Sequence, residues 1–141
     1  MAALRLLVEQ GPERTDCVID EEHLGRMTLG DRALEREVLE IFARQTTLSL
    51  DRLVGVEPAR AAAVAHTLKG SARGVGAWRV ARAAERLEQA AAGKFDDQAI
   101  HAAIAQLEAA AIEVREAIGV RLGDRLEEIT ADAPGQRSRD H

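Results

Sequence analysis

Apolar residues recur every three or four positions along most of the chain, which is the repeat of an amphipathic α-helix. Glycine, proline and capping residues interrupt this pattern, so we predict one short helix and then four long ones. The predicted helices cover residues 20–27, 32–54, 58–73, 77–92 and 96–118. Short connections favour antiparallel packing of consecutive helices. The predicted fold class is therefore all-α, an up-down-up-down antiparallel four-helix bundle with a short N-terminal helical or extended cap and a disordered C-terminal tail.

Local signals place the ends of the predicted helices. Asp20 is typical of an N-cap, and Thr28 or Asp31 caps the helix that follows. Pro58 suits the first position of the next helix. Gly119 is expected to interrupt or end the last long helix, with a further helical segment or a continuation beyond it. In the helix predicted over 32–54, the residues that recur at helical spacing are Leu34, Val38, Ile41, Phe42, Gln45, Leu48 and Leu53.

The pattern divides the chain into three parts. Residues 1–19 are expected to form a poorly defined N-terminal extension, and residues 20–122 the bundle. Residues 123–141 are expected to form a C-terminal extension that is partly helical and then disordered. The sequence contains no internal repeat and no low-complexity linker, so we expect no second domain.

Composition narrows the classes of function. A length of 141 residues suffices for one domain with its own core, which must be built from aliphatic side chains because only 2% of the residues are aromatic. The net charge of −5 argues against a nucleic acid partner. Cys17 is the only cysteine, which excludes an internal disulfide and a cysteine-based zinc site. The sequence contains no run of about 18 apolar residues, so it predicts no membrane span. We expect a cytoplasmic monomer.

The segment from Ala59 to Gly76 holds the candidate chemistry. On a helical wheel, His66 lies well away from the apolar stripe that faces the core. Lys69 follows one turn later on the histidine's side. The other outer neighbours of His66 are small where a solvated helix face usually carries long polar side chains, namely Ala59, Ala62, Ala63 and Gly70. Because glycine costs about 0.5–1 kcal/mol in a helix interior, the pattern suggests close approach of another surface to His66.

These residue types suit phosphoryl transfer. An exposed imidazole is largely neutral at pH 7, and a neutral ring nitrogen can attack phosphorus. The ammonium group of Lys69 can hold the oxygens of the incoming phosphoryl group. Arg73, Arg79 and Arg82 either add a positive patch for an acidic partner or form an ordinary solvated face.

The sequence from Ala65 to Ala72, Ala-His-Thr-Leu-Lys-Gly-Ser-Ala, resembles the histidine-containing phosphotransfer (HPt) domains of bacterial multistep phosphorelays. Val75-Gly76-Ala77, Ala81, Ala84 and Leu87-Glu88 extend the resemblance. It implies a four-helix bundle with His66 as the phospho-acceptor, Lys69 as the phosphate-stabilising residue and Gly70 as the point of receiver approach. We further expect Ala62, Ala63 and Arg73 to contribute to receiver docking.

The function expected from this resemblance is a phosphocarrier that moves a phosphoryl group between receiver-domain aspartates of a two-component phosphorelay. Its partners would be the receivers of a hybrid histidine kinase or of a response regulator. We expect the chain to bind no metal or other cofactor, because Mg²⁺ would belong to the receiver. The sequence contains no nucleotide-binding glycine loop, so we expect no autophosphorylation with ATP.

Two other classes remain open at this stage. One is a non-catalytic helical adaptor of a signalling complex, in which His66 has no chemical use. The other is a fragment of a dimeric histidine-kinase bundle, in which two chains pair. A di-iron bundle is excluded because such sites need Glu-x-x-His on two helices, and the sequence lacks that motif.

Overall fold

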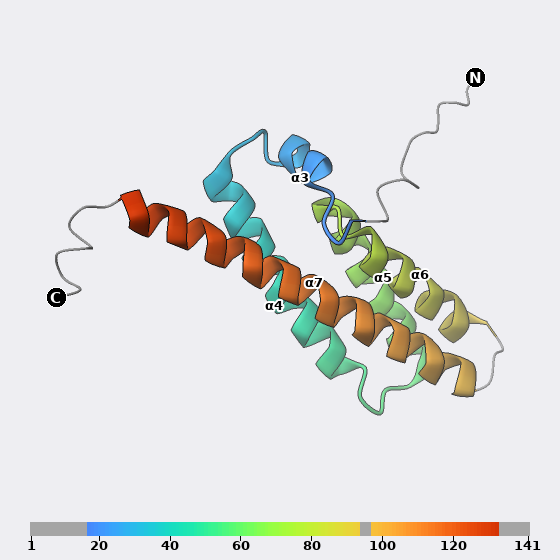
Figure 1. Cartoon of the computed structure of the whole chain (residues 1–141). Helices are drawn as coiled ribbons and strands as arrows, with labels where there is room; N and C mark the ends of the chain where they lie inside the picture. The colour runs from blue at the N-terminus through green and yellow to red at the C-terminus, as the bar shows by residue number, and fades with distance from the viewer. Residues whose placement is uncertain (1–16, 94–96, 133–141) are drawn as a thin grey trace, which may run out of the picture.

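The computed structural model describes residues 17–93 and 97–132, and within them all regular structure is helical. The helices are α3 (Glu21–Met27), α4 (Arg32–Arg52), α5 (Pro58–Val75), α6 (Trp78–Ala92) and α7 (Asp97–Asp132). Helices α4 to α7 form an antiparallel bundle, and α3 lies across one end of it (Figure 1). The predicted all-α bundle is confirmed. Most of the N-terminal extension, residues 1–16, and the disorder predicted for residues 133–141 fall outside the described residues.

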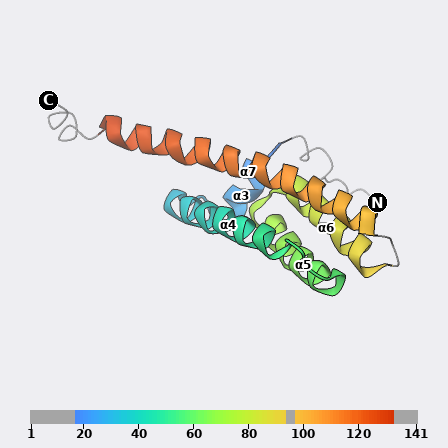
Figure 2. The same ribbon diagram turned by 90° about the horizontal axis from the view of Figure 1, so that it is seen from below.

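Each long helix contacts its neighbours along the chain, and α4 also packs on α7 to close the bundle. Seen from below, α7 and α6 lie along one side and α4 and α5 along the other (Figure 2). The α5–α6 pair has the most extensive packing. Most of its buried residues are alanine, which lets the two backbones approach closely. The buried residues of the pair include Ala61, Ala65, Leu68, Ala72, Ala83, Ala84 and Leu87.

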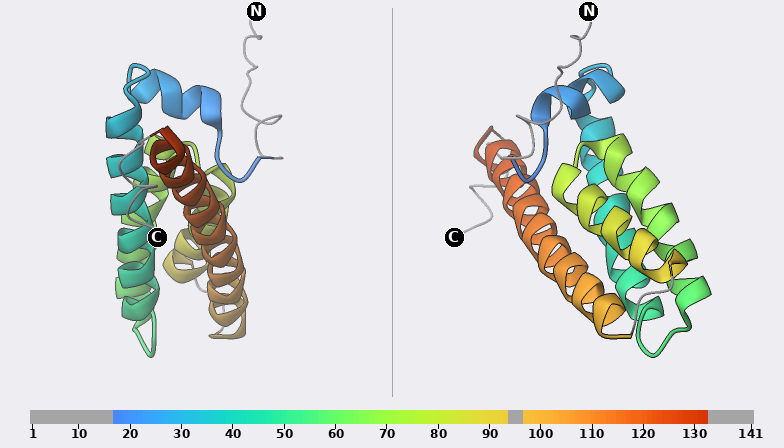
Figure 3. Two further views of the ribbon diagram at one scale, coloured as in Figure 1. Left: turned by 60° about the vertical axis from the view of Figure 1, so that its left-hand side comes forward. Right: turned by 90° about the vertical axis from the view of Figure 1, so that its right-hand side faces the viewer.

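The connection between α5 and α6 is fixed by contacts with the start of α3, at the end of the bundle shown uppermost in Figure 3. Gly76 ends α5 in the left-handed conformation, with φ of 82°. Its carbonyl accepts a hydrogen bond from the backbone N–H of Asp20 at 2.9 Å. One carboxylate oxygen of Asp20 caps α3 by accepting from the N–H of His23, and the other accepts from Nε1 of Trp78 at 2.9 Å. Asp20 therefore joins α3 to the beginning of α6.

Gly76→Ala is expected to destabilise the fold by about 2 kcal/mol, since a left-handed conformation strains any residue with a Cβ. A Cβ at Gly76 would also lie only 3.1 Å from both the Cβ and the carbonyl oxygen of Asp20. The measurement is the free energy of unfolding in urea. The matched control is Gly74→Ala, where an added Cβ meets no atom within 4 Å. Equal stability of the two variants would contradict the argument.

Helix α4 turns only part of its apolar residues toward the core. Of the residues at helical spacing, Phe42 and Leu53 are buried, but Leu34, Ile41 and Leu48 are 40%, 49% and 55% exposed. The inner face consists instead of Glu35, Leu39, Phe42, Thr46 and Ser49. Its polar groups are satisfied locally: the hydroxyl of Thr46 donates to the carbonyl of Phe42 at 2.8 Å. Asp31, and not Thr28, caps this helix by accepting from the N–H of Leu34.

Helix α7 continues without interruption through Gly119, so the alternative of a continuous helix is the correct one. It has 36 residues against 15 in α6, so its C-terminal part extends past α6. Arg121 fixes this part by donating to Glu35 of α4 and pairing with Glu21 of α3, both at 2.9 Å. No helix within the described residues has the length and hydropathy needed to cross a bilayer.

Candidate functional site

His66 lies in the middle of α5 and points out of the bundle. Its side chain is 69% exposed, while Ala65 and Leu68 on either side of it in the sequence face the core. Pro58 at the start of α5 and Gly76 at its C-cap fix the ends of this helix. The helical phase that buries the apolar stripe therefore exposes the imidazole, as the sequence predicts.

A carboxylate on the neighbouring helix connects His66 and Lys69. Glu88 of α6 lies with one oxygen, Oε2, 2.8 Å from Nδ1 of His66. Its other oxygen, Oε1, lies 2.8 Å from Nζ of Lys69. The Lys69 side chain is only 16% exposed, so its aliphatic part packs against the bundle while its charge meets Glu88. The three groups form one hydrogen-bonded unit across the α5–α6 interface.

The charge of Glu88 decides which nitrogen of His66 holds the proton. Hydrogen bonds from Lys69 and then from His66 lower the pKa of the Glu88 carboxyl, so this group is ionised at neutral pH. An ionised carboxylate only accepts hydrogen bonds, which requires that Nδ1 of His66 donates. In the neutral ring, the lone pair is then on Nε2. Among the side chains that the structure describes, none forms a hydrogen bond with Nε2.

Glu88→Gln is expected to lower stability at pH 7 and to have a smaller effect in acid. Because the pKa of Glu88 is lowered by folding, its contribution is present above the ordinary value of 4.5 and is lost as the pH falls through the folded value. The measurement is the urea midpoint of both proteins from pH 7 to pH 3. Glu108→Gln, at an exposed position of α7, is the control and should differ little from wild type throughout. If the loss of stability in Glu88→Gln stays the same from pH 7 to pH 3, the prediction is wrong.

The residues predicted for docking surround the imidazole on α5. Ala62 and Ala63 lie one turn before His66, and Gly70 one turn after it. Ala63 and Gly70 are exposed, Ala62 is half-buried, and a Cβ added at Gly70 would meet no atom within 4 Å. Arg73 is also exposed but lies 3.9 Å from Glu85 of α6. The imidazole thus has no bulky neighbour one turn away on its own helix except Lys69.

The predicted positive patch is largely paired with carboxylates. Arg73 faces Glu85, and Arg79 donates to Glu113 of α7 at 2.7 Å. Arg82 is exposed. Within the described residues there is also no cluster of three or more His, Cys, Asp or Glu side chains suited to a metal ion.

Glu88 is the member of the site to which sequence reasoning assigned no role. In an antiparallel pair of helices, residues equally far from the connecting loop lie at the same height. His66 lies about as many residues before Gly76 as Glu88 lies after it. That symmetry about the predicted turn was the signal that could have found Glu88.

The structure is thus an antiparallel helical bundle with an exposed histidine beside a lysine–glutamate pair. Residues 36–132, more than half of the chain, match the family model described as Hpt domain, so the chain belongs to the Hpt domain family. Hpt domains act as phosphocarriers in phosphorelays. Neither curated proteins nor solved structures give a significant match to this chain.

Proposed function

We propose that this chain carries a phosphoryl group between receiver-domain aspartates and holds it on Nε2 of His66. The observation that supports this most directly is the contact of Glu88 with Nδ1, which leaves the outward nitrogen as the nucleophile. The family supports phosphotransfer in general. The assignment to His66 rests on its exposure and on its unoccupied nitrogen.

In the proposed reaction, Nε2 of His66 attacks the phosphorus of a receiver's phosphoaspartate. The N–P bond forms while the bond from phosphorus to the aspartyl oxygen breaks, and the receiver's carboxylate leaves with that electron pair. The imidazole keeps its Nδ1 proton, so the ring becomes positively charged. Glu88 lies 2.8 Å from Nδ1 and stabilises that charge. Attack by the carboxylate of a second receiver reverses these steps.

Lys69 is proposed to hold the phosphoryl oxygens. Its ammonium group is paired with Glu88 before transfer, so a phosphoryl group on His66 would compete with Glu88 for it. The positive charge that develops on the ring gives Glu88 a second partner at that moment. We propose that this exchange lets Lys69 turn toward the phosphate without leaving Glu88 unpaired. The chain needs no cofactor of its own in this scheme, and any Mg²⁺ belongs to the receiver.

The proposed docking surface is centred on His66 and consists of Ala62, Ala63, Gly70 and Arg73. Small side chains above and below the imidazole leave space for the rim of a receiver's active site, where the aspartate lies. We propose that the chain acts as a monomer in the cytoplasm, without nucleic acid or membrane partners.

The test is to mix the purified chain with receiver domains phosphorylated by acetyl phosphate, in the presence of Mg²⁺. Acid-labile, base-stable label on this chain is the expected result. Transfer from no receiver of a broad panel would favour the adaptor. Incorporation of label from ATP alone, together with a dimer in sedimentation, would favour the kinase-like bundle.

A further inference from the structure

The hydrogen bond between Glu88 and His66 involves the ring nitrogen that takes no direct part in the proposed transfer. Oε2 of Glu88 lies 2.8 Å from Nδ1, whereas the proposed nucleophile is Nε2. The side chain of His66 is 69% exposed and that of Glu88 only 25%, so the contact lies on the inner side of the ring. A phosphoryl group can therefore enter and leave at Nε2 while the contact at Nδ1 stays in place.

The proton on Nδ1 determines what kind of leaving group the ring is. With this proton in place, the phosphorylated ring is a cation and leaves as neutral imidazole when the bond from phosphorus to Nε2 breaks. Without the proton, the ring would leave as the imidazolate anion, which is a far stronger base and a poorer leaving group. Phosphoryl transfer passes through a loose transition state in which this bond is largely broken, so the difference acts strongly on the rate.

Glu88 is well placed to keep this proton on the ring. Hydrogen bonds from Lys69 and His66 lower the pKa of Glu88, so its carboxylate is ionised and favours a positively charged ring. Among the side chains that the structure describes, no other forms a hydrogen bond or ion pair with the ring of His66. The charge of Lys69 opposes a cationic ring, but its Nζ is paired with the same carboxylate at 2.8 Å. Glu85, one turn earlier on α6, lies 3.9 Å from Arg73.

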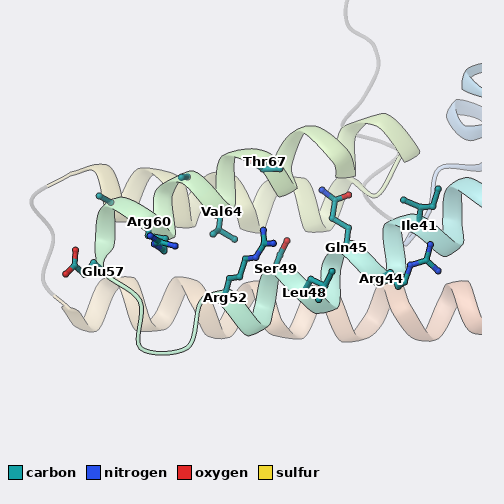
Figure 4. Close-up of a pocket in the computed structure, with 12 residues that line it drawn as sticks. Ile41, Arg44, Gln45, Leu48, Ser49, Arg52, Glu57, Arg60, Val64 and Thr67 are labelled. Atoms are coloured by element: carbon teal, nitrogen blue, oxygen red, sulfur yellow. The ribbon is translucent and has the colours of Figure 1, made fainter.

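The side of His66 that faces α4 provides no comparable support. Ala63 and Thr67, which precede and follow His66 on α5, line a groove between α4 and α5 (Figure 4). The charged residues that line this groove are Arg44, Arg52, Glu57 and Arg60. Three of these four are cations, so the groove opposes a further positive charge on the ring. Retention of the Nδ1 proton therefore depends on the carboxylate from α6.

We propose that Glu88 keeps the proton on Nδ1 for as long as His66 carries the phosphoryl group, and that it thereby acts mainly on the step that passes this group on. In that step the attacking oxygen forms a bond to phosphorus, and the bond from phosphorus to Nε2 breaks with its electron pair going to Nε2. The ring is released as neutral imidazole with its Nδ1 proton. Glu88 is thus a positioning residue that also sets the charge of the leaving group. The inference rests on the proposed function, because it concerns how the carrier releases its phosphoryl group.

The first test follows the release of label from phosphorylated wild type and Glu88→Gln between pH 6 and pH 9. Both proteins are phosphorylated with phosphoramidate and then mixed with an excess of receiver and Mg²⁺. Glutamine can accept the hydrogen bond from Nδ1 but lacks the negative charge. The two rates should agree within about twofold at pH 6, and wild type should be about tenfold or more faster at pH 9, because only wild type keeps the proton there. A role in orientation alone would give a ratio that does not change with pH.

Two controls isolate the charge of Glu88. Glu108→Gln makes the same charge change at an exposed position of α7 and should follow wild type at every pH. Because Glu88→Gln also frees Lys69, the comparison is repeated between Lys69→Gln and Lys69→Gln/Glu88→Gln. The ratio of rates should rise with pH in this pair as well. If the ratio is constant, the effect comes from Lys69 and the inference is wrong.

The second test measures the proton directly and needs no receiver. The ³¹P resonance of the phosphorylated ring shifts when Nδ1 loses its proton, and the midpoint of this shift should be about one pH unit or more higher in wild type than in Glu88→Gln. Equal midpoints would overturn the inference. Loss of label to water should show the same pH-dependent ratio as loss to a receiver. If no receiver accepts the label, the proposed function fails, while the resonance and the loss to water still decide the role of Glu88.

Discussion

His66→Gln is expected to reduce base-stable label on the chain to background in transfer from any phosphorylated receiver. Glutamine is similar in length to histidine and can still donate a hydrogen bond to Glu88. Its amide nitrogen has no available lone pair and does not attack phosphorus. The fold should be unchanged, because the side chain of His66 is 69% exposed and takes no part in the core.

The matched control is His101→Gln, which removes an exposed histidine from α7. This variant should accept label at the rate of wild type. If label persists in His66→Gln and disappears in His101→Gln, the assignment of the phospho-acceptor to His66 is wrong. Phosphoramidate provides a second measurement that does not depend on a receiver. It should label wild type and His101→Gln, and the base-stable label should be lost in His66→Gln.

Gly70→Gln is expected to lower kcat/KM for transfer by about 100-fold while the protein remains folded. The added side chain meets no atom within 4 Å at its Cβ, and glutamine is the better helix former by about 0.5–1 kcal/mol. The loss therefore comes from the space above His66 that a receiver needs. Circular dichroism and the urea midpoint measure the fold, and phosphoramidate labelling measures the intrinsic reactivity of the imidazole.

Gly119→Gln provides the comparison, because Gly119 is also exposed within a helix and also has no atom within 4 Å of an added Cβ. It should gain similar stability and lose no transfer. Normal transfer by Gly70→Gln would remove the argument that small residues around His66 serve docking. A parallel loss of phosphoramidate labelling would place the defect in the imidazole itself.

The helix ends and the exposure of His66 could be predicted because local chemistry determines them. Asp20 caps a helix, Pro58 begins one, and Gly76 provides a left-handed C-cap, whatever the rest of the chain does. The position of His66 opposite a regular stripe of alanine, valine and leucine follows from the helical repeat alone. These features could be predicted without knowing which helices pack against each other.

The orientation of α4 could not be predicted in the same way. Two stripes run side by side along this helix, one with Leu34, Ile41 and Leu48 and the other with Leu39, Phe42 and Thr46. Periodicity does not choose between adjacent stripes. The observed choice is supported by Arg121 of α7, whose hydrogen bond to Glu35 makes the burial of that carboxylate tolerable. Such a partner lies far away in the sequence and is known only once the bundle is assembled.

The role of Glu88 could not be predicted without knowing that α5 pairs with α6. The continuity of α7 through Gly119 likewise depends on how α7 packs against the bundle. A glycine lowers helix stability by about 1 kcal/mol, which tertiary contacts readily outweigh. Ile118 and Leu122 pack against the core on either side of this glycine, so the helix continues. The family of the protein was evident from the sequence between Ala65 and Ala72, but the arrangement of charge around its histidine was not.

The lysine–glutamate pair beside the imidazole also affects which molecules reach it. A bare ammonium group there would attract inorganic phosphate, nucleotides and other small anions, and these would obstruct the ring. Because Nζ of Lys69 lies 2.8 Å from a carboxylate oxygen, the vacant site has little net charge to concentrate them. The exposed ring of His66 would therefore stay accessible in a solution crowded with competing anions, and in the proposed transfer Lys69 would leave Glu88 only for a phosphoryl group already on that ring.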